Sequence, residues 1–275
     1  MGYSIYEQRL ADLESEVEFL RGLEKQKRLA PYLDGDDCYP CRPAHLDFGA
    51  ELTYLAPNST TGLGPSGIAF FPSSEMLPSW RSWIGYTGTN GLGLRLRYWE
   101  FDHLVTNGVN AFTYGLDAST VDLELTFSKS FVNEWDVLLS GGVRHLAFHE
   151  DRTAIGTSSV DSDLTGLLVG AEVRRNLVGG FRAYGLARTA SVFGDLTGEV
   201  PSGFIVHLEG RNVFMYESQL GVEYCRETCC GELSLRVGAE VMHWDSVSYK
   251  NISGTDSTAE SVGLVGLVTG ITLRR

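Results

Sequence analysis

Residues 91–103 (GLGLRLRYWEFDH) alternate two kinds of side chain, and this alternation constrains the fold more than any other feature. Side chains point to opposite faces along a strand. One face of such a strand is apolar and carries Leu92, Leu94, Leu96 and Tyr98. The opposite face carries Gly93, Arg95 and Arg97. The apolar face therefore packs on the core of a soluble sandwich or meets lipid around a transmembrane barrel. The alternation breaks after Tyr98, where we expect the lipid-facing surface to stop.

The pattern recurs in ten strands from residue 45 to the end, and the connections between them sort by length. Short connections lie at 88–91, 130–134, 176–180 and 226–231. The connections between them are longer and lie at 57–79, 103–110, 150–162, 195–211 and 246–260. Outer-membrane barrels have short turns on one side and long loops on the other, whereas a soluble sandwich has no such rule. We therefore predict an all-β, closed, up-and-down antiparallel transmembrane β-barrel; a soluble Greek-key or lipocalin-like barrel is the alternative.

Strand alternation assigns side chains to the two faces of this barrel. The residues predicted to line the lumen are Arg95, Arg97, Glu124, Arg144, Glu172, Arg174, Glu217, Glu223, Arg236 and Glu240. The residues predicted to face lipid are Leu92, Leu94, Leu96, Leu123, Leu125, Val169, Leu235 and Val237. Acidic residues outnumber arginines on the whole predicted inner face, so any conduction would weakly favour small cations.

The chain before the barrel has a different character. Apolar residues recur at spacings of three and four within residues 1–30, which predicts an amphipathic, coiled-coil-like α-helix. About three heptads are marginal alone, so the helix would form a homo-oligomer or dock elsewhere. A solvated amphipathic helix is the alternative. Residues 31–44 are rich in Pro, Asp and Gly and read as a linker. With both chain ends on the short-turn side, we expect this helix to lie in the periplasm.

Composition excludes some classes of protein. The net charge of −13 argues against a nucleic-acid partner, because phosphate binding needs a basic surface. No apolar run is long enough for a transmembrane helix. No apolar signal segment precedes the predicted helix, and the chain ends without an aromatic residue. We therefore expect a mature or shortened form of an exported protein.

Five cysteines lie in two groups, Cys38 with Cys41 and Cys225 with Cys229 and Cys230. The first group has the CxxC spacing of redox and zinc sites, but CxxxCC is poor spacing for a second pair of zinc ligands. We therefore favour a structural disulfide over a metal, including one that bridges the hairpin turn at 225–230. Disulfides would mildly indicate an oxidising compartment.

Several stretches together resemble a known family. They are LRLRYWEFDH, LLSGGVRHLAFHED, residues 166–192 and LGVEYCRETCCGELSLRVGAEVMHW. These stretches resemble the pore-forming outer-membrane β-barrel family related to the Legionella major outer-membrane protein, particularly planctomycete-type members, and the resemblance covers about residues 40–275. The resemblance implies a bacterium of the Gram-negative type, an outer-membrane location and a pore-forming role.

The sequence favours a passive function over catalysis. We expect a narrow, porin-like channel for small solutes or ions in contact with outer-membrane lipid, although side chains largely fill a lumen of this size. A structural or adhesion barrel acting through its extracellular loops is the alternative. A rim hydrolase is a weaker one, based on His103, His149 and His243 beside acids near the strand ends. No nucleophile motif is present, and we expect no cofactor, metal or catalytic residue.

Overall fold

The computed structural model describes residues 17–18, 44–59, 76–107, 112–131, 134–153, 157–199, 205–229, 231–250 and 258–275. Residues 17–18 are helical. The rest of the helix predicted at 1–30, and almost all of the linker predicted at 31–44, lie outside the described residues. No described helix is long and apolar enough to cross a membrane.

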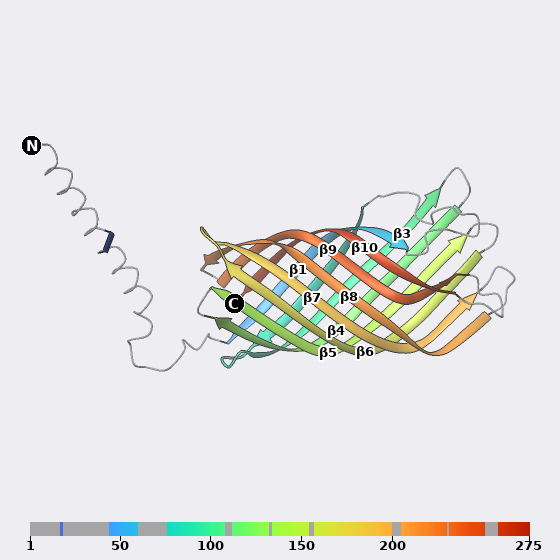
Figure 1. Cartoon of the computed structure of the whole chain (residues 1–275), viewed down its shortest axis with the longest axis horizontal. Coiled ribbons are helices and arrows are strands. Elements are labelled where there is room, and N and C mark those ends of the chain that lie inside the picture. Colours follow the sequence, from blue (N-terminus) through green and yellow to red (C-terminus); the bar gives the residue numbers. More distant parts are fainter. Residues whose placement is uncertain are drawn as a thin grey trace, which may run out of the picture. The chain divides into compact units, whose positions relative to one another are not determined.

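Ten strands follow one another in the chain (Figure 1). They are β1 (His45–Ser59), β2 (Leu77–Thr87), β3 (Leu92–Asn107), β4 (Phe112–Phe131), β5 (Trp135–Thr153), β6 (Thr157–Asn176), β7 (Phe181–Glu199), β8 (Ile205–Thr228), β9 (Gly231–Lys250) and β10 (Thr258–Arg274). Each strand pairs antiparallel with its neighbours in sequence, and β1 also pairs with β10, so the sheet closes on itself.

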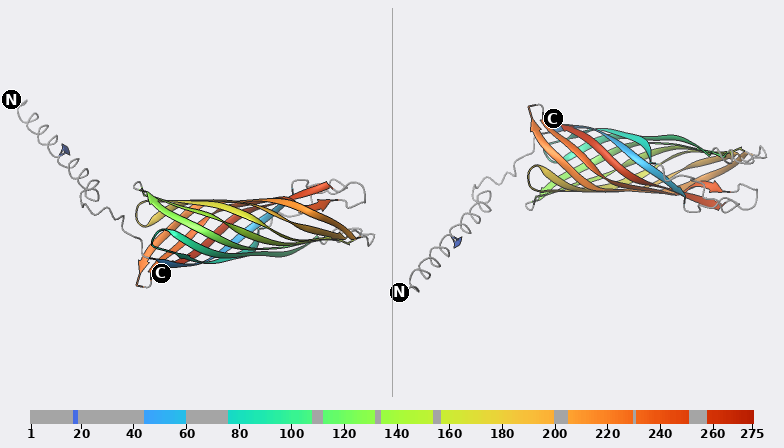
Figure 2. Two further views of the ribbon diagram at one scale, coloured as in Figure 1. Left: turned by 90° about the horizontal axis from the view of Figure 1, so that it is seen from below. Right: turned by 90° about the horizontal axis from the view of Figure 1, so that it is seen from above.

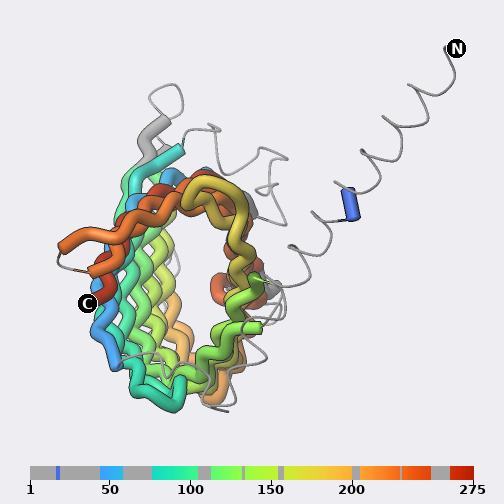
Figure 3. Tube along the Cα trace, turned by 90° about the vertical axis from the view of Figure 1, so that its left-hand side faces the viewer, coloured from blue at the N-terminus to red at the C-terminus, as the bar shows by residue number. Residues whose placement is uncertain are grey.

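Closure between β1 and β10 is extensive. The register runs from Asp47 opposite Arg274 to Ser59 opposite Val262. Past the end of β10, Leu46 and Arg275 exchange two backbone hydrogen bonds of 2.7 and 2.8 Å. Figure 3 shows the strands surrounding a central space, and Figure 2 shows them inclined to the long axis of the barrel. The predicted closed, up-and-down antiparallel barrel of ten strands is therefore confirmed.

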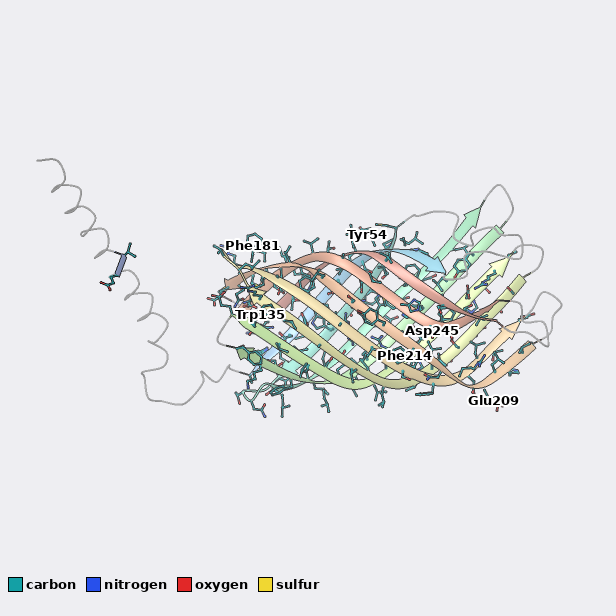
Figure 4. The ribbon with its side chains drawn as sticks, viewed as in Figure 1. Tyr54, Trp135, Phe181, Glu209, Phe214 and Asp245 are labelled. Atoms are coloured by element: carbon teal, nitrogen blue, oxygen red, sulfur yellow. The ribbon has the colours of Figure 1, made fainter. Side chains whose placement is uncertain are left out.

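An apolar band surrounds the half of the barrel nearer the short turns. On β8 it runs from Phe214 to Tyr224, where alternate side chains are exposed and mostly apolar. Aromatic side chains mark both borders. Trp135 and Phe181 lie at the short-turn end, and Tyr54 and Phe214 lie about half-way along the barrel (Figure 4). Trp80 and Tyr98 belong to the half-way border, with ring centroids 5.1 Å apart.

Most strands continue well beyond this band, because β3–β9 are 16 to 24 residues long. We call their continuation toward the long connections the extension. Apolar and polar residues exchange faces where it begins. On β3, Leu96 points outward and is 47% exposed, whereas Trp99 and Phe101 point inward and are each 1% exposed. The extension thus has an apolar interior and a polar exterior.

The extension corrects four of the predicted long loops. The segments 103–110, 150–162, 195–211 and 246–260 are largely strand, and the described strands there leave gaps of only 108–111, 154–156, 200–204 and 251–257. The sequence pattern was misleading because the apolar residues move to the inner face at this level. The polar residues of the outer face then read as a loop. The connection predicted at 57–79 lies mostly outside the described residues.

Candidate functional site

The interior of the barrel contains a cluster of buried charges centred on Glu217 of β8. Its carboxylate lies 3.1 Å from Arg81, 3.2 Å from Arg97, 3.4 Å from Arg144 and 3.1 Å from Arg188. Three of these arginines come from β2, β3 and β5, which do not neighbour β8 in the sheet. The contacts therefore cross the lumen and close it at this level.

Further ion pairs surround Glu217. Arg81 donates hydrogen bonds of 2.6 Å to Glu51 and to Glu240. Arg144 binds Asp122 through two parallel hydrogen bonds of 2.7 and 2.8 Å, the geometry in which a guanidinium best matches a carboxylate. Arg188 donates to Asp122 at 2.7 Å and also to Glu124. Each of these charges is thus neutralised inside the barrel.

The cluster and the pairs next to it form what we call the ionic tier. Its arginines are Arg81, Arg95, Arg97, Arg144, Arg174, Arg188 and Arg236. Its acids are Glu51, Asp122, Glu124, Glu172, Glu217, Glu223 and Glu240. The two sets are equal in number, so acids do not outnumber arginines within the tier.

Sequence reasoning left Arg81 and Arg188 out of the lumen. Arg81 lies on β2, whose apolar alternation is weak. Arg188 lies on β7 and shares its inward face with Tyr184 and Leu186, so the phase of that strand was ambiguous. The signal that could have found both arginines is charge balance, because buried acids need an equal number of cationic partners.

An aromatic layer lies on the short-turn side of the ionic tier. The guanidinium of Arg236 lies 5.0 Å from the Trp83 ring and 5.5 Å from the Tyr184 ring, and Arg97 lies 6.0 Å from Trp83. These distances are typical of cation–π contacts. Trp83 also lies across Gly49, where a Cβ atom would come within 2.0 Å of the indole. Glycine at this position is therefore required for the tryptophan to fold onto β1.

An apolar tier fills the lumen on the other side, inside the extension. Trp99 and Trp244 meet edge to face with centroids 5.5 Å apart, and Phe148 contacts Trp244 at 6.1 Å. The indole of Trp99 donates a 3.0 Å hydrogen bond to Ser79 Oγ. The tier consists of Leu55, Trp99, Phe101, Tyr114, Leu116, Ala118, Leu146, Phe148, Val160, Leu164, Leu168, Ala190, Val192, Leu196, Val213, Met215, Met242, Trp244, Val247, Val262 and Leu264. None of these is more than 4% exposed, as in the core of a soluble protein.

The outer surface of the extension is acidic. Asp102 and Asp117 face one another across β3 and β4, and the next residues in that row are His149 on β5 and Asp161 on β6. Partial burial and the nearby carboxylates of Asp102 and Glu100 raise the pKa of Asp117. His149 bonds to Asp161 at 2.5 Å and to Asp151 at 2.9 Å, which connects the tips of β5 and β6.

Both sets of residues predicted from strand alternation have clear positions. All ten residues predicted to line the lumen form ion pairs of the ionic tier, and eight of them are at most 9% exposed. Arg95 and Arg174 are somewhat more accessible, with side chains 12% and 16% exposed. The eight residues predicted to face lipid are 47% to 70% exposed on the outer wall.

The remaining predicted residues are not gathered into one site. His103 points inward and bonds to Pro78 O, whereas His149 and His243 lie on the outer face of the wall. The three histidines therefore do not converge as a rim hydrolase would need. Cys225 forms no disulfide, so the structure does not contain the turn bridge that we expected from it. Cys229 is exposed, and the other three cysteines lie outside the described residues.

Comparisons with known proteins show the fold. No protein-family model matches the chain, and no curated protein matches its sequence. The structure is similar to the outer-membrane protease OmpT from Escherichia coli, with a TM-score of 0.53, 9% identity, and coverage of 87% of this chain and 99% of that one. The translocator domain of the autotransporter NalP from Neisseria meningitidis matches with a TM-score of 0.46, 11% identity, and coverage of 95% and 97%. A major outer membrane protein from Thermus thermophilus matches with a TM-score of 0.41 and 12% identity, over 84% and 99%.

Proposed function

We propose that the chain is a sealed outer-membrane barrel that acts as a structural or adhesion protein through its loop-side end. The observation that carries this proposal is the filled interior. The aromatic layer, the ionic tier and the apolar tier succeed one another along the lumen. A solute would have to break buried ion pairs and then cross a packed apolar core.

The outer wall supports a position in a membrane. The apolar band on β8 runs over residues 214–224, and a tilted strand needs about 9–11 residues to cross a bilayer. Aromatic side chains at both borders of the band are typical of barrels at the two membrane–water interfaces. The fold shared with OmpT is consistent with the outer membrane of a bacterium. Membership of the Legionella-related family stays a prediction.

The extension supports a role outside the membrane. Its exterior is polar and acidic, and its interior is as well packed as a soluble core. This combination suits a rigid wall that stands in water beyond the membrane. We further propose that the short turns face the periplasm, where the predicted N-terminal helix would lie and could join several copies of the chain.

Conductance across a planar bilayer tests the sealed lumen. We expect the refolded full chain to give no stable current steps, because the buried charges around Glu217 are paired with one another and the apolar tier excludes water. Reproducible single-channel steps would instead establish the narrow passive channel predicted from the sequence. Heat-modifiable gel mobility would confirm that the inserted protein is folded.

Surface binding tests the adhesion role separately. Replacing residues 60–75, between Ser59 and Leu77, by a Gly/Ser linker leaves every described strand intact. We expect this variant to remain folded and sealed but to lose attachment of displaying cells to host or abiotic surfaces. Unchanged attachment would argue for a purely structural barrel.

A further inference from the structure

A recess opens into the barrel from the short-turn end and reaches inward to Trp83 and to two arginines of the ionic tier, Arg95 and Arg174. We call it the vestibule. It is continuous with solvent at the rim, and strands β1–β6 and β10 contribute to its wall. The residues important for its chemistry are Asp47, Trp83, Arg95, Arg174, Thr272 and Arg274.

The inner end of the vestibule is richer in cations than in anions. Three guanidinium groups, those of Arg95, Arg174 and Arg274, line it together with the carboxylate of Asp47, and Lys129, Asp136 and Glu172 line the rest of the recess. Arg274 donates to Asp47 at 2.9 Å, and the other oxygen of Asp47 lies 3.4 Å from His45. Asp47 is therefore already engaged on both of its oxygens.

The three arginines have N–H donors that their carboxylate contacts do not use, although Arg274 also donates to Glu232 at 3.3 Å. A guanidinium carries five N–H donors, and one carboxylate contact uses one or two of them. Among the described residues, Arg95 donates only to Glu124, at 2.7 Å, and its buried Nε has no hydrogen-bond partner. Arg174 uses Nε and Nη2 on Glu172, at 2.9 and 2.8 Å. Unused N–H groups on planar forks suit an oxyanion, which accepts two parallel hydrogen bonds.

The vestibule ends blindly. Trp83 lines its inner end and lies against Arg236 and Arg97, beyond which the ionic tier closes the lumen. Any ligand therefore enters and leaves from the short-turn side. This geometry suits a pocket that retains a solute from one compartment and does not suit a passage between two.

We propose that the vestibule binds the carboxylate or phosphate group of a small solute that arrives from the short-turn side. Arg174 and Arg274 bind the oxyanion, Arg95 lies behind it, and the hydroxyl of Thr272 lines the same wall. This site is independent of the proposed adhesion role, which concerns the opposite end of the barrel.

The indole N–H resonance of Trp83 in the detergent-solubilised full chain tests this proposal. The variant Trp83→Phe assigns the resonance by removing it. Titration with inorganic phosphate, and separately with acetate, at constant ionic strength should shift the Trp83 signal saturably. Arg174→Gln should weaken the binding at least tenfold. Arg174→Lys, which keeps the charge but loses the fork, should have an intermediate effect.

Arg175→Gln is the matched control, because Arg175 neighbours Arg174 but lies 5.3 Å from the outer-wall ring of Trp135. It should bind as the unmodified chain does. Heat-modifiable gel mobility would show that each variant is folded, and Arg274→Gln replaces Arg174→Gln if the latter is not. A linear, unsaturable shift, equal affinity in Arg174→Gln and the control, or a saturable shift with calcium chloride but not with phosphate or acetate would each overturn the proposal.

Discussion

At the scale of single residues, Glu217 holds the position on which most of the ionic tier depends. Its carboxylate contacts four arginines from four strands, all of them at most 6% exposed in their side chains. Burying charges costs several kcal/mol per ion unless each is paired. The removal of one acid from such a group is therefore worse than the loss of a single contact, because the remaining cations cannot reach water.

We expect Glu217→Gln to lower the free energy of unfolding by about 3–5 kcal/mol, the range for breaking a buried ion pair from one side. Urea unfolding in lipid vesicles, followed by tryptophan fluorescence, measures this. Glu227→Gln, at an exposed position near the end of β8, is the control and should be nearly neutral. If the double variant Glu217→Gln/Arg188→Gln were as unstable as the sum of the two single changes, the charge-balance explanation would be wrong.

His149, on the outer face of the extension, gives a pH dependence with a definite sign. Partial burial disfavours its charged form, but hydrogen bonds to Asp161 and Asp151 outweigh this and raise its pKa above 6.5. A raised pKa means that the contacts of protonated His149 with Asp161 and Asp151 stabilise the fold fully below about pH 6.5. The stabilisation is lost as the pH rises through the raised value.

Imidazole NMR signals measured against pH test this expectation directly. The His149 signal should titrate above 6.5 in the unmodified chain and fall toward the ordinary value in Asp161→Asn. His207, whose partner is the hydroxyl of Thr197, offers a comparison in the same extension without a bonded carboxylate. A His149 pKa at or below 6.5 would contradict the stabilising contacts of protonated His149 with the two aspartates.

At the scale of the strands, the sequence predicts the band better than the extension. In β3 the alternation from Leu92 to Tyr98 places each side chain on the face where the structure has it. Beyond Tyr98 the alternation continues, but Trp99 and Phe101 bring the apolar residues to the inner face. A pattern search that assumes one apolar face for the whole strand therefore ends the strand at Tyr98. Ion pairing across the lumen was equally hidden, because it joins strands that are distant in the chain.

Trp99→Ala tests the strand-level claim that the extension has a true core. Trp99 is 1% exposed and contacts Trp244 and Ser79, so its truncation leaves a cavity and removes one of the two hydrogen bonds of the Ser79 hydroxyl, the other being to Thr53. We expect a loss of about 3–5 kcal/mol in the free energy of unfolding. Trp80→Ala, on the outer wall of the neighbouring strand, should cost clearly less because that ring is 46% exposed. Equal losses would show that the apolar tier is not a packed core.

At the scale of the whole barrel, the two halves have opposite polarity. The half near the short turns is apolar outside and charged inside, whereas the extension is polar outside and apolar inside. Each half alone resembles a known solution to strand packing, namely a membrane barrel and a soluble barrel. Continuous strands join them, so under the proposed outer-membrane location we expect the membrane border near the ring of aromatic residues that includes Tyr54, Trp80, Tyr98 and Phe214.

Depth-dependent quenching of tryptophan by brominated lipids tests where this border lies. The native tryptophans of the outer wall, Trp80 and Trp135, are replaced by Phe, and one reporter is then added at an outward position of β3. Leu94→Trp lies in the apolar band, whereas Leu104→Trp lies on the extension; the native residues are 48% and 68% exposed. Because brominated acyl chains quench only at contact, Leu94→Trp should be strongly quenched and Leu104→Trp should not. Equal quenching would place the extension inside the bilayer, where its outward carboxylates could not remain charged at acceptable cost.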